Sequence, residues 1–243
     1  LPGCGRSCCR ALIENCSVMF QNSNFDTLFE TKTDKNGKYQ ICLPKGKYSN
    51  MGAIDMDTYP HTMRSGMKNE DLRLEFWGWN FIADRDTTLN IRYDRMEVYG
   101  LHAFQIPGGV PAYQIYVRPM SLTRFLVEKG IENAQHKEDL SGVTQAASVE
   151  IAKCDNLAPA IDKVGIKVWI DGEEVPVLMK QQIKEYYEAT EYGIAYYLTV
   201  GIPQIRTSLP YQIVKVELTD LENGVRGEAV YYLEKNDYIE CGK

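Results

Sequence analysis

The feature that most limits the fold of this 243-residue chain is a series of short alternating segments separated by tight turns. The turns are Asp34-Lys35-Asn36-Gly37, Asp171-Gly172 and Glu222-Asn223-Gly224. Asp and Asn side chains bond their own backbone, and Gly supplies the positive φ that closes a hairpin. The pattern therefore predicts an all-β protein with hairpins in both halves of the chain.

Strand-like runs precede and follow these turns. They are short, and apolar and polar residues alternate along many of them. In the first half the pattern predicts strands at 16–20, 27–33, 38–43 and 88–93. In the second half it predicts strands at 97–106, 112–117, 164–170, 174–179, 194–200, 211–218 and 226–233. The only helix-compatible window of the second half is 180–190, and a polar stretch at about 128–148 predicts a long loop.

Composition agrees with a β-rich globular protein and argues against two classes of partner. The chain has 16 Tyr, against 7 Phe and 3 Trp, and Tyr favours half-buried strand positions. Its net charge is −6 with no basic block, whereas nucleic-acid binding needs clustered Lys and Arg. No apolar stretch approaches the roughly 18 residues that a membrane span needs. We therefore expect neither nucleic-acid binding nor membrane insertion.

Seven cysteines are distributed unevenly, with four near the start of the chain. Zinc sites usually need two closely spaced pairs, and this sequence has a single cluster. Cys16 and Cys42 both fall in predicted strands, where they could form a disulfide or serve as small buried apolar residues. The sequence therefore predicts no metal and no cofactor, and cysteine usage does not decide the compartment.

A longer motif lies between Thr31 and Tyr48, where the sequence reads TKTDKNGKYQICLPKGKY. It closely resembles the T-x-T-D-x-x-G-x-Y-x-I-x-L-P-x-G-x-Y motif of carboxypeptidase regulatory-like domains. The resemblance covers about residues 10–94. It implies a seven-stranded, transthyretin-like sandwich that props, spaces or binds and does not catalyse. The Cys-rich start replaces the family's usual opening strand, so we expect the first strand to be shortened or rebuilt.

From Met96 onward the pattern changes, and turns about every ten residues are typical of an immunoglobulin-like sandwich. We therefore expect two β-sandwiches in tandem, residues 1–94 being carboxypeptidase regulatory-like and residues 95–243 immunoglobulin-like. The type of the first domain favours the extracellular space or the cell surface and leaves the cytoplasm open. Because the chain begins at Leu1 without a signal-peptide core, we expect a segment of a longer product.

No catalytic motif stands out in the sequence. It has no G-x-S-x-G elbow, Walker loop or H-E-x-x-H pattern, and its three histidines lie far apart. Asp55 and Asp57 could bind Ca²⁺ or act as acid and base, but chance proximity is the default in a chain with 33 acidic residues. We therefore predict no catalytic residue and no enzyme. A motif-less activity, with the polar stretch 128–144 as a lid, is the weaker alternative.

The most informative constellation lies between Leu72 and Phe81. With a period of two, Leu72, Leu74 and Phe76 share one strand face and point to the core. The opposite face then projects into solvent as a stacking platform for sugar rings, bordered by loop residues. The predicted ligand-binding residues are Trp77, Trp79, Arg73 and Glu75, with Asp55, Asp57 and Tyr59 lining the same surface. The alternative is that a bulge at Gly78 turns the indoles inward, or that they pack against the second domain.

Two functions follow from these observations. The first is a non-catalytic accessory or binding module that contacts a polysaccharide through exposed tryptophans. The second is a structural spacer or assembly protein, an oligomer or a partner of another protein, that uses tyrosine-rich edges. Exposure of Trp77 and Trp79 is the observation that separates the two.

Overall fold

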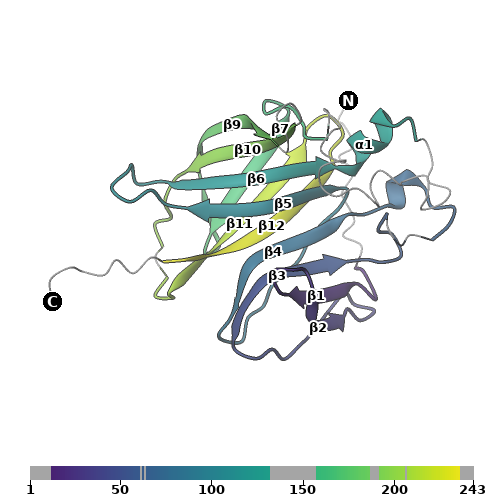
Figure 1. The fold of residues 1–243 in the computed structure, drawn as a ribbon, viewed down its shortest axis with the longest axis horizontal. Coiled ribbons are helices and arrows are strands. Elements are labelled where there is room, and N and C mark those ends of the chain that lie inside the picture. The colour runs from purple at the N-terminus through teal and green to yellow at the C-terminus, as the bar shows by residue number, and fades with distance from the viewer. Residues whose placement is uncertain are drawn as a thin grey trace, which may run out of the picture.

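The computed structural model describes residues 12–60, 62, 64–131, 157–186, 192–205 and 207–235. Its architecture is an all-β sandwich of two sheets (Figure 1), which confirms the predicted fold class. Strands account for most of the described elements, and they are joined by one short α-helix and one 3₁₀ turn. The predicted loop at 128–148 lies almost entirely outside the described residues.

The larger sheet has eight strands in the order β2-β1-β3-β4-β12-β11-β7-β8. It combines strands from both ends of the chain, and most neighbours are antiparallel. Its strands are β1 (Ser17–Gln21), β2 (Thr27–Lys32), β3 (Gly46–Ile54), β4 (Glu75–Ala83), β7 (Val164–Ile170), β8 (Glu173–Val175), β11 (Tyr211–Asp220) and β12 (Arg226–Glu234).

The smaller sheet has four strands in the order β5-β6-β10-β9 and lies over one half of the larger sheet (Figure 1). Its strands are β5 (Met96–Phe104), β6 (Tyr113–Ser121), β9 (Val177–Tyr186) and β10 (Tyr192–Val200). The window 180–190, read as helix-compatible, forms part of β9 as far as it is described, because it pairs along its length with β10.

One pairing joins the two halves of the chain. β4 and β12 run parallel, with Trp77 opposite Ala229 and Trp79 opposite Tyr231. The larger sheet is therefore continuous across the predicted boundary at residue 94. The division into two tandem domains stays a prediction, and the strands on either side of it share one sheet.

Each face of the larger sheet carries its own core. Between the two sheets, fully buried aliphatic residues meet from β6, β7, β10 and β11, among them Ile115, Val168, Leu198 and Val216. On the opposite face, Phe76, Tyr232 and their neighbours are covered by the segments 38–43 and 88–93. These two segments were expected to be strands. They pack alternate side chains on the core, and the second joins a sheet only through the bridge of Tyr93 to Gly227.

The helix α1 (Leu122–Glu128) was not expected from the sequence. Its signal is local, because Ser121 precedes an apolar i, i+3, i+4 set, and the Ser121 hydroxyl accepts a hydrogen bond from the Arg124 backbone N–H. Its buried face, formed by Leu122, Phe125 and Leu126, packs in a small core with Leu72 and Leu74.

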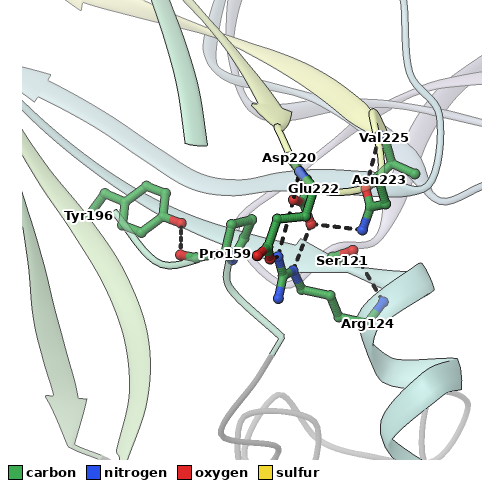
Figure 2. A network of polar contacts seen from close by, with 8 residues as sticks. All are labelled: Ser121, Arg124, Pro159, Tyr196, Asp220, Glu222, Asn223 and Val225. Carbon is green, nitrogen blue, oxygen red and sulfur yellow. Dashed lines mark hydrogen bonds and ion pairs between the residues drawn. The ribbon is translucent and has the colours of Figure 1, made fainter. Parts of the chain in front are cut away.

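α1 is tied to the turn between β11 and β12 by a buried ion pair (Figure 2). Arg124 donates from Nε to Asp220 Oδ2 at 2.6 Å and from a terminal nitrogen to Glu222. Asp220 also accepts from Asn223 Nδ2 and from the Glu222 backbone N–H. The charge of Asp220, whose side chain is fully buried, is therefore surrounded by donors.

Candidate functional site

The two tryptophans of β4 lie at the centre of an aromatic cluster. Their rings are stacked, with centroids 5.4 Å apart and planes inclined by 26°. Phe25, from the turn between β1 and β2, and Tyr99, from β5, pack edge-on against both indoles. We call Phe25, Trp77, Trp79 and Tyr99 the indole cluster.

The alternation along β4 follows the predicted period of two as far as Asn80. Phe76 joins the core on one face, and Trp77 and Trp79 lie on the other. At Asn80 the backbone has a φ of 51°, in the left-handed region that Asn tolerates better than most residues. The Asn80 side-chain amide donates to the Tyr232 carbonyl at 2.7 Å. The kink returns Phe81 to the Phe76 core, so the deviation lies at Asn80 and not at Gly78.

The predicted exposure of this face is wrong for two of its residues. Trp77 is 8% exposed and Glu75 is 6% exposed, and Trp79 is half-buried. The face is covered because β5 approaches β4 with Glu97 and Tyr99, and because Phe25 lies over the indoles. Trp77 is therefore a packed residue, and no open sugar platform spans both rings.

Phe25 has an unusual backbone for a bulky side chain. Its φ is 63°, which costs an L-residue about 1–2 kcal/mol. The turn is shaped by Asn22, whose Oδ1 accepts from the backbone N–H groups of Asn24 and Asp26. Contacts of the ring with the two indoles offset the strain, yet 44% of Phe25 stays in solvent. The ring is a cover held at the surface by a strained turn.

Two buried carboxyl groups border the indole cluster. The Trp77 Nε1–H donates to Glu97 Oε1 at 2.6 Å, and the Tyr59 hydroxyl donates to Glu75 Oε1 at 3.3 Å. Burial raises the pKa of Glu97 to about 7, although the Trp77 hydrogen bond acts in the opposite direction. Burial, followed by the charge of Glu97, raises the pKa of Glu75 well above its ordinary value. Both carboxyls therefore take up a proton at higher pH than an exposed glutamate does.

A charged rim lies beyond Tyr99. Arg118 on β6 donates from Nε and from a terminal nitrogen to the carboxylate of Glu185 on β9, at 2.7 and 2.5 Å. Its guanidinium also lies over the Tyr99 ring, 5.6 Å from the centroid. These contacts fix Tyr99 from the side of the small sheet, so the indole cluster is held between both sheets.

Of the predicted site residues, the structure brings Tyr59, Glu75, Trp77 and Trp79 together. The remaining three have partners elsewhere. Arg73 pairs with Asp94 at 3.2 Å, Asp57 pairs with Arg64, and Asp55 accepts from the Thr58 hydroxyl at 2.9 Å. Phe25, Glu97 and Tyr99 were missed because they come from other strands and turns, and nothing in their local sequence indicates which strand they will meet.

The site shows no constellation of metal ligands. Within the described ranges, no group of three or more His, Cys, Asp or Glu side chains is gathered as a metal ion would require. The described helices are also too short or too polar to cross a bilayer.

Comparisons with known proteins yielded little. No family model matches the chain, and no curated protein matches it. The resemblance to carboxypeptidase regulatory-like domains therefore stays a prediction. Among solved structures, the crystal structure of BcpA, the major pilin subunit of Bacillus cereus, is 11% identical with a TM-score of 0.21. The match covers 91% of this chain and 65% of the pilin chain. At that TM-score the likeness supports no inference about function.

Proposed function

We propose that this chain is a non-catalytic binding module that takes a carbohydrate ring at the Trp79 side of the indole cluster. The observation that supports the proposal most is the half-buried Trp79, stacked on a fixed neighbour and covered by Phe25 from a strained surface turn. Sugar rings present flat C–H faces that pack on indoles, and a preorganised indole loses little freedom on binding. Displacement of Phe25 opens the ring face to a ligand.

The fixed neighbour is Trp77. Its hydrogen bond to Glu97 and its contact with Tyr99 hold the indole in one orientation, and the second ring inherits that orientation by stacking. Trp77 therefore acts as support for Trp79 and is not itself the contact surface. This division of roles differs from the symmetrical pair expected from the sequence.

The test compares Trp79→Ala with Trp169→Ala on affinity gels that contain immobilised polysaccharides. Trp169 is the matched control, because it is also a half-buried strand tryptophan and contacts Lys215 on the far part of the large sheet. We expect retention of the wild type and of Trp169→Ala, and loss of retention for Trp79→Ala. Absence of wild-type retention on every polysaccharide contradicts the proposal.

A second function, protein assembly, is favoured by one observation. β9 is an edge strand of the small sheet and exposes Leu178, Met179 and Tyr186. Edge strands with exposed apolar side chains are templates for pairing with another chain. Light scattering tests this function: a defined oligomer that Leu178→Lys dissociates supports it, and a monomer at all concentrations contradicts it.

A further inference from the structure

Three polar side chains form a row across the face that carries the indole cluster. Gln21 on β1 is directly opposite Asn50 on β3, and Asn50 is directly opposite Trp79 on β4. Directly paired residues of antiparallel strands project from the same face with Cβ atoms about 5 Å apart. Gln21, Asn50 and Trp79, which we call the polar row, therefore lie side by side next to the stacked indoles.

Each member of the polar row has a buried polar atom without a hydrogen-bond partner. These atoms are Gln21 Oε1, Asn50 Oδ1 and Trp79 Nε1, and no described residue pairs with them. Gln21 is only 7% exposed and Asn50 only 2%. Buried polar groups are nearly always paired in folded proteins, so three such atoms in adjacent positions need a common explanation.

The position of Gln21 links the polar row to the turn that carries Phe25. Its Nε2 donates to the Phe25 carbonyl at 3.1 Å and to Thr27 Oγ1 at 3.4 Å. Because the amide nitrogen is committed to the turn, the identity and direction of the free Oε1 acceptor are fixed. A movement of Phe25 therefore changes access to the indoles, and it also alters the hydrogen bond that orients the Gln21 side chain.

We propose that the polar row is a hydroxyl-binding subsite for two neighbouring hydroxyls of a neutral saccharide, covered by Phe25 in the free protein. The inference rests on the proposed function and specifies its ligand. One hydroxyl accepts from Trp79 Nε1 and donates to Asn50 Oδ1, and the next hydroxyl donates to Gln21 Oε1. A hydroxyl can accept and donate at once, which matches one donor between two acceptors.

The surroundings select against acidic sugars. The unpartnered buried atoms of the row are two carbonyl acceptors and one donor, and an anion needs donors or cations. Glu75 and Glu97 lie at the far side of Trp77 and add negative charge when they ionise. Neutral hexoses with a vicinal diol fit this arrangement, and uronic acids do not.

The experiment is titration calorimetry of the full chain with tetrasaccharides of glucose, galactose, mannose and N-acetylglucosamine, and with polyuronic counterparts. The variants are Asn50→Leu, Gln21→Met and Trp79→Phe. Each removes the unpaired polar atom of one row residue and keeps most of the side-chain volume, and the first two also remove the amide nitrogen. Gln181→Met, on the exposed part of β9, is the matched control. Melting temperatures are measured for all variants.

We expect the wild type to bind a neutral tetrasaccharide and no uronic chain. Each row variant should weaken binding about tenfold, the size of one lost hydrogen bond. The melting temperature of Asn50→Leu should stay level or rise, because it removes a buried acceptor with no partner. Gln21→Met also loses the Nε2 hydrogen bonds to Phe25 and Thr27, and Trp79→Phe loses ring contact with Trp77, so both should melt somewhat lower. Gln181→Met should bind as the wild type does.

Three results overturn the inference. If the wild type binds and the row variants bind equally well, the subsite is refuted and the proposed function stands. If no tetrasaccharide binds to the wild type, both fail. If Asn50→Leu lowers the melting temperature by more than about 5 °C, the row serves the fold and not a ligand.

Discussion

The molecule contains two buried polar clusters, and they are built in opposite ways. Around Asp220, three groups donate to one carboxylate: the Arg124 guanidinium, the Asn223 side-chain amide and the Glu222 backbone N–H. Around the indole cluster, two carboxyls lie near each other, and the described part of the chain places no ion-paired cation on them and leaves several polar atoms without partners. The first arrangement suits a permanent structural contact between α1 and the β11–β12 turn. The second suits a surface whose free polar groups form hydrogen bonds with a ligand.

The pKa directions of the two clusters differ in the same way. Burial acts to raise the pKa of Asp220, but the bonds from Arg124 and from the turn outweigh it and hold that pKa below its ordinary value. Glu97 and Glu75 lack comparable donors, so burial prevails and raises both. Burial alone therefore does not distinguish a structural acid from one that holds a proton, because the number of donors decides the outcome.

Removing the Arg124–Asp220 ion pair should have the largest effect on stability. Arg124→Met leaves the Asp220 charge buried without its main partner, and we expect a loss of about 3–5 kcal/mol in the free energy of unfolding. Urea unfolding measures it. Glu222→Gln, which alters the half-exposed partner of the same arginine, should cost at most about 1 kcal/mol. Equal losses for the two variants would contradict the assigned role of Asp220.

The acid pair should give a pH dependence of intermediate size. Because the pKa of Glu97 is raised from 4.5 to about 7, its contribution is fully present below pH 4.5 and is lost as the pH rises through 7. We expect the free energy of unfolding to fall by about 2–3 kcal/mol over that range. In Glu97→Gln this fall should become smaller, and what remains comes from Glu75, whose pKa burial also raises.

Glu185→Gln is the control for that measurement. Glu185 is paired with Arg118, and its pKa is lowered although burial acts against the shift, so its contribution is lost only toward acid pH. The fall between pH 4.5 and 7 should therefore persist in Glu185→Gln. A flat wild-type profile across this window would show that the two clusters do not differ in protonation.

Phe25→Ala should have the smallest effect on stability. It removes the ring contacts with Trp77 and Trp79, which is partly offset because a smaller side chain is less strained at positive φ. We expect a change within about 1 kcal/mol and a red shift of tryptophan fluorescence as Trp79 meets solvent. An unchanged spectrum would mean that Phe25 does not cover the indoles.

The sequence predicted the elements of the second half better than the placement of the first. The strand at 164–170 has the predicted bounds, and 211–218 and 226–233 differ by two residues or fewer, because each adjoins a turn with strong local chemistry. The sequence correctly predicted that Glu75, Trp77 and Trp79 share one face of the strand, but it did not predict that this face is covered. Phe25, together with Glu97 and Tyr99 on β5, covers this face. Which strands and turns come to lie against β4 depends on the tertiary packing of the two sheets, and the local sequence does not show it.

The parallel contact of β4 with β12 also bears on how the chain is made. Among the described strands β12 is the last to be synthesised, and it fills the place between β4 and β11 in the large sheet. A nascent chain that has released residues 12–200 therefore still presents β4 with one edge unpaired. Because this closure spans about 150 residues, we expect slow, late folding and a need for protection of β4 on the ribosome.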